Sequence, residues 1–457
     1  MKLSTIQATL AEHGLQPTRS LGQNFLHDQN LARWTVDQLE LTPGDAWVEI
    51  GPGLGSLTEF AMERSANGLL IEKDDRLIPY LRDAFSTLEL VHGDASEFDI
   101  RELWKRGPVK VLGNLPYYVS SQIMFNFCRE PSPVRRLVFT LQKELAERLS
   151  AAPGTKDYGA LTLLIGRRWR VKYVRTLPPG VFTPVPQVES AVVTLNLRDP
   201  DELPACDSQR FERLVKQGFS QRRKQMRKLI ASELQDWPAA AAAVGVQETA
   251  RAEELSLEQW IALTNVATAQ SSPHSTNGQP SELASLAQDV HGEIFDVVDE
   301  SDTVTGTASR HDVHRQKLLH RAVHIFVFNE KGELFMQRRS RWKDVHPRRW
   351  DSSAAGHVNS GQDYAGTASR EIVEELGVSA DLTEIGQIKA CEGTGWEFVR
   401  IYKGTHEGPF TLHPAEIESG DWFTIPQLEA WIAARPEDFA TGFLECWRIF
   451  RAASGND

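Results

Sequence analysis

The sequence predicts an α/β fold in which a doubly wound sheet is followed by a small α-helical domain and then by a separate domain of mixed α+β structure. Three observations predict it. Short apolar runs alternate with helical patterns between Trp47 and Leu197, the pattern becomes helical after Asp199, and a polar stretch at 268–288 precedes a new set of apolar runs. Alternating strands and helices are typical of a sheet covered by helices on both faces.

The expected strands of the first sheet are short apolar runs separated by helical segments. They are residues 47–50, 68–71, 88–91, 109–112, 137–140 and 190–195. We place this first domain at residues 1–200. The α-helical domain, at residues 201–267, contains a basic stretch from Arg210 to Lys228.

A linker and a different domain follow. Residues 269–280 are rich in serine and proline and have no apolar periodicity, which is typical of a flexible linker. We expect the linker at residues 268–290 and the last domain at 291–457. The last domain lacks the regular alternation of the first, so the two halves are not a duplication. Its expected strands are residues 293–299, 324–328, 334–337 and 398–402.

The composition is that of a globular protein with more than one domain. The 457 residues are 41% hydrophobic and 25% charged, which is enough apolar material for two or three cores. A net charge of -12 argues against a uniformly basic nucleic-acid binder, so RNA contact requires a local basic surface. The four cysteines are scattered singly, which fits neither a disulfide framework nor a zinc ribbon, and no apolar run is long enough for a membrane span. We therefore expect a cytoplasmic protein without membrane contact.

A glycine-rich loop follows the first strand. Gly51, Gly53 and Gly55 come directly after Ile50, and glycines there let the backbone turn sharply and approach a ligand without Cβ clashes. The spacing is G-x-G-x-G, and Leu57 stands where a dinucleotide-binding loop carries its later glycine. This difference favours S-adenosylmethionine over NAD as the ligand.

Two acids end the next two strands. Glu72 lies about twenty residues after Gly51, where a carboxylate can accept hydrogen bonds from both ribose hydroxyls of a nucleoside. Asp94 lies where the exocyclic amine of the ligand's adenine needs an acceptor. Each acid alone is as easily explained as a cap for the following helix. The glycine loop and both acids occurring in order favour the ligand interpretation.

The tetrapeptide Asn114-Leu-Pro-Tyr117 follows the fourth strand. Adenine N6 is a poor nucleophile because its lone pair is conjugated with the ring. The side-chain oxygen of Asn114 and the carbonyl of Leu115 can accept the two N–H groups and direct the lone pair at the sulfonium methyl, which places Asn114 in both the base and the cofactor site. Tyr117 can stack on an extruded base. In isolation the tetrapeptide also fits a simple turn with a core tyrosine.

Residues 1 to about 265 resemble, on these motifs, the ribosomal RNA small-subunit adenine dimethyltransferase family. The resemblance implies S-adenosylmethionine as cofactor and the 16S rRNA of the small ribosomal subunit as partner, with dimethylation of two adjacent adenosines in its 3′-terminal hairpin. It also implies that Phe182 sandwiches the target adenine against Tyr117. A segment closing over the methionine part of the cofactor is implied at Gln23, Asn24 and Leu26.

The basic stretch of the helical domain matches the family's basic signature at Phe219–Lys224. A charge run is often only a solvated helix face. Here it lies in the domain expected to hold an RNA backbone within an acidic protein, so phosphate contact is favoured. The expected RNA-binding residues are Arg222, Arg223, Lys224, Arg227 and Lys228.

A second site is predicted in the last domain. Glu371, Glu374 and Glu375 share one face of a helix because they are spaced i, i+3 and i+4. Three like charges repel, and a hard cation such as Mg²⁺ relieves the repulsion while binding diphosphate oxygens. An acidic, solvent-facing helix is the alternative. The spacing from Gly356 to Arg370-Glu371 disfavours that alternative.

Residues from about 291 to 450 resemble the Nudix family on this box. The resemblance implies Glu374 and Glu375 as metal ligands, Glu371 as a ligand or as the base that activates water, and a diphosphate-containing small molecule as substrate. The first glutamate of the box is Gln362 here, which reduces its ion pair with Arg370 to a neutral hydrogen bond.

Within that family, the segments 320–328 and 350–357 look most like the branch that includes isopentenyl-diphosphate isomerase. The isomerase cysteine falls at Ala355, which disfavours isomerase chemistry and leaves diphosphate hydrolysis. His320 and His357 match isomerase metal-site histidines approximately, although single histidines are more often structural.

The leading hypothesis is a bifunctional enzyme, an rRNA adenine N6-dimethyltransferase joined to a Mg²⁺-dependent Nudix diphosphate hydrolase. One alternative is a ribosome-assembly RNA-binding factor whose methylation is secondary. Another makes the last domain an isomerase relative or a non-catalytic binding module.

Overall fold

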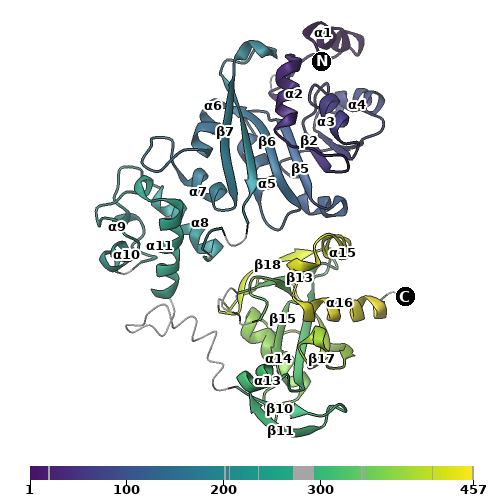
Figure 1. Ribbon diagram of the computed structural model, residues 1–457, viewed down its shortest axis with the longest axis vertical. Coiled ribbons are helices and arrows are strands. Elements are labelled where there is room, and N and C mark those ends of the chain that lie inside the picture. Colours follow the sequence, from purple (N-terminus) through teal and green to yellow (C-terminus); the bar gives the residue numbers. More distant parts are fainter. Residues whose placement is uncertain are drawn as a thin grey trace. The chain divides into compact units, whose positions relative to one another are not determined.

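The computed structural model describes residues 1–18, 21–199, 202–204, 206–234, 236–270, 293–340, 343, 345–413 and 415–454. They form two compact units (Figure 1). Met1–Cys206 and Phe211–Thr264 make the first, and Asp207–Arg210 and Asn265–Asp457 make the second. The expected helical domain therefore groups with the first sheet in one unit, and a boundary at residue 200 stays a prediction. Of the expected linker, residues 268–270 end the helix α11 (Leu257–Gln270) and residues 271–290 lie outside the described part.

The first unit is built on a seven-stranded sheet in the order β4-β3-β2-β5-β6-β9-β7. The strands from β4 to β6 run parallel, and β9 and β7 are antiparallel to their neighbours. Their bounds are β2 (Ala46–Ile50), β3 (Gly68–Glu72), β4 (Glu89–His92), β5 (Val109–Asn114), β6 (Val134–Gln142), β7 (Trp169–Leu177) and β9 (Ser190–Leu197). This sheet confirms the predicted doubly wound α/β class and contains all six predicted strands.

Alternate residues of the strands pack into two separate cores because successive side chains of a strand point to opposite faces. Val48 and Ile50 pack on one face, and Trp47 packs on the other. The first face is covered by η3 (Ile100–Arg106), α5 (Ser120–Cys128), α6 (Lys143–Leu149) and α7 (Ala160–Gly166). The second is covered by α1 (Leu3–Glu12), α2 (Gln29–Asp37), α3 (Thr58–Arg64) and α4 (Ile78–Ala84).

The strand β7 was not predicted from the sequence. Its outward positions include Arg170, which is exposed, so the segment has no apolar run of the kind that marks the other strands. It is the edge strand of the sheet, where charged side chains are common because they discourage pairing with other chains.

The helical part of the first unit packs around Trp260 of α11. A Cβ added at Gly218, the last residue of α8 (Ser208–Gly218), would come within 2.4 Å of the Trp260 ring. Phe219 stacks on the same ring with centroids 5.8 Å apart. The shorter helices α9 (Met226–Leu229) and α10 (Trp237–Ala243) complete this part.

The second unit has its own mixed sheet, in the order β14-β13-β12-β17-β16 with β15 on β12 and β18 on β13. A separate hairpin joins β10 (Ile294–Val298) and β11 (Val304–Ser309). The sheet strands are β12 (His320–Phe328), β13 (Leu334–Arg339), β14 (Trp350–Asp351), β15 (Ala354–His357), β16 (Thr383–Ile388), β17 (Glu397–Thr405) and β18 (Ile417–Phe423). The helices are α13 (Arg310–Gln316), α14 (Tyr364–Leu376), α15 (Ile425–Ala434) and α16 (Thr441–Ser454). The predicted mixed α+β class is confirmed.

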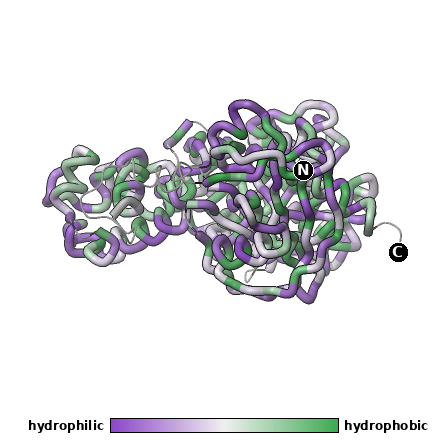
Figure 2. The backbone as a smooth tube through the Cα atoms, turned by 90° about the horizontal axis from the view of Figure 1, so that it is seen from below, coloured by the Kyte–Doolittle hydropathy of each residue, from purple (hydrophilic) through white to green (hydrophobic). Residues whose placement is uncertain are grey.

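The predicted carboxylate helix is α14. Asp363 caps its N-terminus by accepting a hydrogen bond from the Gly366 amide, and Gly377 ends it in the left-handed conformation at φ 71°. In Figure 2 hydrophobic and hydrophilic residues alternate along the backbone, as expected for amphipathic strands and helices around a core. Within the described ranges, no helix has the length and apolar character needed to cross a membrane.

Candidate functional site

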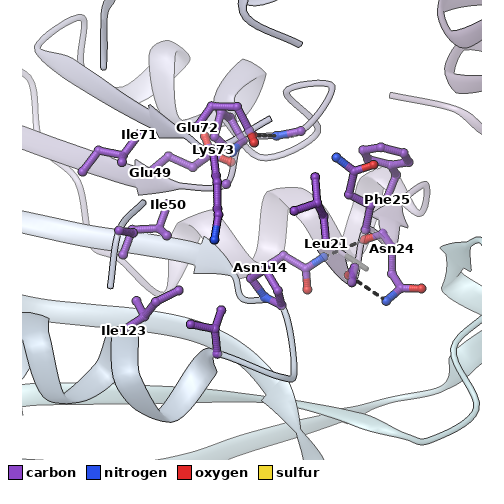
Figure 3. Close-up of a pocket in the computed structure, with 18 of the residues that line it drawn as sticks. Leu21, Asn24, Phe25, Glu49, Ile50, Ile71, Glu72, Lys73, Asn114 and Ile123 are labelled. Carbon is purple, nitrogen blue, oxygen red and sulfur yellow. Dashed lines mark hydrogen bonds between the residues drawn. The ribbon is translucent and has the colours of Figure 1, made fainter. Parts of the chain in front are cut away.

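A cavity lies at the carboxyl ends of the parallel strands β2, β3 and β5, with about 860 Å³ of open space. This is the position where open α/β sheets bind ligands, because neighbouring strands connect in opposite directions there. Figure 3 shows Glu72 and Lys73 on one side of the space and Asn24 and Phe25 on the other. The predicted residues that line it are Gln23, Asn24, Leu26, Gly51, Gly53, Glu72, Asp94 and Asn114.

The three glycines of the loop have different surroundings. Gly51 and Gly53 line the cavity at φ 63° and 58°, and a Cβ on Gly53 would come within 2.9 Å of the Phe25 ring. Gly55 does not line it. A Cβ there would lie 2.1 Å from the Phe85 ring, so Gly55 lets the loop pack against α4's end. Its predicted contact with the cofactor stays a prediction.

The two strand-end acids are both held by hydrogen bonds. Glu72 is buried and accepts from the amides of Asp74 at 2.8 Å and Gly53 at 3.3 Å, and burial raises the pKa of its carboxyl. For Asp94, burial raises the pKa, but hydrogen bonds from Lys73 at 2.6 Å and from Ser96 outweigh it, so the pKa is lowered. Both carboxylates are thus fixed at the edge of the cavity.

The side chain of Asn114 is fixed by the segment across the cavity. Its Nδ2 donates to the main-chain carbonyl of Asn24 at 2.7 Å, drawn as a dashed line in Figure 3. Because the NH₂ group is committed, the Oδ1 atom remains to accept a hydrogen bond. Leu115, by contrast, is only 1% exposed and does not line the cavity.

Tyr117 and Phe182 are the two aromatic residues expected to sandwich a base. Within the described part of the chain, their rings are not in contact with each other. The Tyr117 hydroxyl lies 2.6 Å from the Ser190 hydroxyl, and the Phe182 ring is 1% exposed within the second core. Phe182 does pair with Leu26, because β1 (Phe25–Leu26) is antiparallel to β8 (Phe182–Thr183). The structure therefore joins the Phe182 strand to the segment that covers the cavity.

Three residues at this site were not predicted. Glu49 is 1% exposed on β2 and lines the cavity, where its carboxylate accepts from the Thr58 hydroxyl at 2.6 Å. Burial raises its pKa to about 8. Lys73 pairs with Asp94, and Asp74 bonds the Gln23 side chain. An acid within an otherwise apolar buried strand was the signal available for Glu49.

The predicted RNA-binding residues lie on a surface of the first unit. All five side chains are exposed, and none of the five pairs with a carboxylate among the described residues. They do not form one continuous basic helix: Arg222, Arg223 and Lys224 lie in the turn that follows α8, while Arg227 and Lys228 lie on the short α9. Arg222 also donates to the Lys156 carbonyl, which ties the turn to the loop between α6 and α7.

In the second unit the predicted carboxylates are brought together on α14. Glu371 and Glu375 are buried, and Glu374 is about half exposed. The Glu371 carboxyl packs on Gly356, where a Cβ would lie within 2.1 Å. Glu375 accepts from the Gln337 side chain and from the Ala355 amide, both at 3.1 Å. Two of the three acids, Glu371 and Glu375, are thus buried, as is Ile372 of the same helix.

Burial raises the pKa of both buried acids, and repulsion from Glu375 helps to raise that of Glu371 to about 8. The nearby Lys343 ammonium is buried and pairs with Glu416, and burial lowers its pKa to about 8. Two buried carboxylates that repel each other and offer hard oxygen donors fit a Mg²⁺ ion.

Arg370 pairs with Glu371 at 2.8 Å and Glu374 at 2.6 Å. The expected hydrogen bond from Arg370 to Gln362 is not formed, because the Gln362 side chain is exposed in the loop before the helix. The arginine instead neutralises part of the carboxylate cluster directly.

A histidine cluster lies beside this helix. His314, His320 and His357 offer ring nitrogens within 4.8 Å of one another. Glu397 Oε1 lies 3.0 Å from His357 Nε2 and 3.5 Å from His320 Nε2. Burial lowers the pKa of His357 to about 3, so its imidazole is neutral. Neutral imidazoles with a carboxylate are donors that suit zinc and related transition metals.

Two family models match the chain. One, described as ribosomal RNA adenine dimethylase, matches residues 14–269, and the other, described as NUDIX domain, matches residues 318–441. The chain is 38% identical over 263 residues to the ribosomal RNA small subunit methyltransferase A of Alkaliphilus oremlandii, covering 54% of this chain and 91% of that protein. The protein of the same name from Myxococcus xanthus is 39% identical over 260 residues, covering 56% and 92%. Among solved structures, the 23S rRNA methyltransferase ErmE aligns with a TM-score of 0.46 at 26% identity, covering 54% of this chain and all of that one.

The buried Glu49 predicts a specific pH dependence of stability. Its carboxyl is protonated in the folded protein up to about pH 8 but ionises near pH 4.5 when unfolded. The folded state therefore binds more protons in this window, and the unfolding free energy of the first unit falls as pH rises, by up to about 1.4 kcal/mol per pH unit. Glu49→Gln keeps an acceptor for Thr58 and should flatten this slope in urea unfolding at pH 5 to 8 without ligand. Equal slopes for the two proteins would contradict the assignment.

Proposed function

We propose that the N-terminal half of the chain transfers methyl groups from S-adenosylmethionine to adenine N6 in small-subunit ribosomal RNA. The proposal starts from the family: over residues 14–269 the chain belongs to the ribosomal RNA adenine dimethylase family. Two adjacent adenosines in the 3′-terminal hairpin of 16S rRNA are the proposed targets, each dimethylated. The observation that carries this proposal is the fixed amide of Asn114 at the carboxyl edge of the sheet.

The residues of the cavity fit the cofactor. Glu72 offers a carboxylate to the ribose hydroxyls, Asp94 offers one to the adenine amine, and the Gly51–Gly53 turn lets the backbone approach the ligand. When bound, S-adenosylmethionine supplies an electrophilic methyl group on a sulfonium. Gln23, Asn24 and Leu26 lie on the segment across the cavity, where the methionine part is expected.

Catalysis by this chain is mainly positioning. The Asn114 Oδ1 accepts one N6 hydrogen, and the Leu115 carbonyl is proposed to accept the other, which directs the N6 lone pair at the methyl group. Leu115 is buried in the structure. Tyr117, with Phe182, is proposed to stack on the extruded base. No general base is required, because the positively charged product loses a proton readily.

The exposed cations of the α8–α9 turn and α9 are proposed to hold the RNA by its phosphates. Arg222, Arg223, Lys224, Arg227 and Lys228 are free of carboxylate partners within the described residues. Phosphate contacts of this kind position the substrate and do not read its sequence. They give the acidic chain the local basic surface that an RNA substrate needs.

Asn114→Ala should reduce methyl transfer by at least about a hundredfold, because the lone-pair-directing acceptor is lost. The assay is transfer of labelled methyl groups from S-adenosylmethionine to small subunits that lack this modification. Tyr117→Phe is the matched control, since it keeps the stacking ring and loses only the bond to Ser190. Transfer by Asn114→Ala at the wild-type rate would make the catalytic assignment wrong, and no transfer by the wild type would favour the RNA-binding assembly factor.

We further propose that the C-terminal half, which carries a NUDIX domain, hydrolyses a diphosphate-containing small molecule with Mg²⁺. Glu371, Glu374 and Glu375 would hold the metal, which supplies a Lewis acid for the diphosphate oxygens. Glu371 is also the candidate base, because burial raises its pKa and a carboxylate of raised pKa, once ionised, takes a proton from water more readily than an exposed one. Lys343 and Arg370 place positive charge beside the same carboxylates.

Glu375→Gln should reduce Mg²⁺-dependent product release at least about tenfold in the full chain, because a buried ligand loses its charge. The measurement is phosphate and diphosphate release from a panel of nucleoside and prenyl diphosphates. Glu429→Gln, an exposed acid on α15, is the control. If no diphosphate on the panel is turned over by the wild-type chain, or if Glu375→Gln equals it, the hydrolase proposal fails.

The histidine cluster favours a second candidate, membership of the isomerase-like branch of this superfamily. His320 and His357 are the histidines expected from that resemblance, and the structure adds His314 and Glu397 beside them. Ala355 still stands in place of the isomerase cysteine, so we propose the branch and not the isomerase reaction.

The cluster predicts a transition metal bound by the full-length chain. Elemental analysis of protein purified with little chelator should find zinc or manganese in the wild type. The same metal should be lost from His320→Ala and from His357→Ala. His311→Ala changes an exposed histidine of the same unit and should retain the metal. Wild-type protein that stays free of such metal after incubation with each ion would rule the site out.

A further inference from the structure

We propose that Asp74 is a positioning residue for methyl transfer: through Gln23 it holds the segment Leu21–Leu26 across the cofactor cavity, and this segment fixes the Asn114 amide. The inference rests on the function proposed for the N-terminal half. Asp74 is buried in the turn between β3 and η2 (Asp75–Leu77) and does not line the cavity. Asp74 therefore affects methyl transfer only through the residues that it holds in place.

The segment Leu21–Leu26 contacts each working part of the site. The Phe25 ring packs on Gly53 of the glycine loop, and Gly22 packs on Pro116, where a Cβ would lie within 3.3 Å. The Asn24 carbonyl accepts from Asn114, and β1 pairs with the strand that carries Phe182. A shift of this short segment would thus move the cofactor and base sites together.

The Gln23 side chain anchors the segment. Its amide is bonded at both ends, because Oε1 accepts from the Thr18 amide at 2.8 Å and Nε2 donates to Asp74 Oδ2 at 2.7 Å. Gln23 is the neighbour of Asn24, whose carbonyl must be placed accurately to hold Asn114. A side chain bonded at both ends gives its neighbour little freedom to move.

Asp74 is itself held from the cofactor side. Its amide donates to Glu72 Oε1 at 2.8 Å, and Arg76 Nε donates to its carboxylate at 2.8 Å. The pKa of this carboxyl is lowered, chiefly by the Arg76 hydrogen bond, so the bond to Gln23 is made to a charged acceptor and is strengthened accordingly. Hydrogen bonds link Glu72, the proposed ribose acceptor, to Asp74 and Asp74 to Gln23; the peptide bond then leads from Gln23 to Asn24, whose carbonyl accepts from Asn114.

The competing explanation is that Asp74 only caps η2, since its side chain also accepts from the Arg76 amide. Serine is a comparable capping residue but is too short to reach Gln23. Asp74→Ser therefore keeps a cap but removes the bond to the segment, together with the ion pair to Arg76. Gln23→Leu removes the same bond from the other side.

The experiment compares both single variants and the double variant in full-length chain. We expect a fall in kcat for methyl transfer of about tenfold or more, from the misplaced Asn114. In Asp74→Ser the KM for S-adenosylmethionine should change less, because Gln23, Glu72, Asp94 and the glycine loop remain. The double variant should lose less than the product of the two single losses, because each single variant already lacks the bond between Gln23 and Asp74. Asp75→Asn, an exposed neighbour, is the control and should match the wild type.

Hydrogen exchange supplies a readout independent of activity. The amides of the peptide containing Gly22–Phe25 should exchange faster in Asp74→Ser, while peptides from β2 and β5 stay unchanged. Wild-type kcat and unchanged exchange in Asp74→Ser, or additive losses in the double variant, would overturn the inference. If the wild type transfers no methyl groups, the proposed function fails, and the exchange comparison still decides whether Asp74 holds the segment.

Discussion

The first unit depends on the parallel alignment of β2, β3 and β5, whose carboxyl ends meet at one edge of the sheet. That alignment brings together residues far apart in the sequence: the glycine loop, Glu72 and Asn114. Each belongs to a buried strand or directly follows one, so its position is set by main-chain hydrogen bonding and core packing. The segment Leu21–Leu26 then closes the edge and bonds the one amide on which the proposed chemistry depends. The site is thus organised before any ligand arrives, which is what catalysis by positioning requires.

The second unit is governed by a different constraint, the burial of like charges. Glu371 and Glu375 lie one helical turn apart and are both shielded from water, with Arg370, Lys343 and Arg339 nearby as compensating cations. Without a metal, this arrangement keeps at least one carboxyl protonated near neutral pH. Folding therefore builds a site that favours cation binding.

The sequence alone was sufficient to predict strands and site residues where the local residue pattern agrees with the tertiary structure. The strands that end at Ile50, Glu72 and Asn114 are apolar runs, and their ligand-facing residues follow from where those runs stop. The sequence was insufficient where a contact joins polar side chains that are far apart along the chain, or where a strand carries many charges. The edge strand β7 carries too many charges to be recognised, and the partner of Gln23 lies 51 residues away at Asp74. The inward turn of Glu371 and Glu375 was also missed, because helical spacing alone does not say which face packs on Gly356. His314 and Glu397 join the histidine cluster only through the packing of α13 and β17 on β12.

The central claim is that this chain modifies adenine N6 in structured small-subunit RNA. Mass spectrometry of the 3′-terminal fragment of 16S rRNA, isolated from small subunits incubated with the full-length chain and S-adenosylmethionine, tests it most directly. The account predicts dimethylation at N6 of both adjacent adenosines in the hairpin. An unmodified fragment, or methyl groups found only on other atoms or other nucleotides, would contradict it.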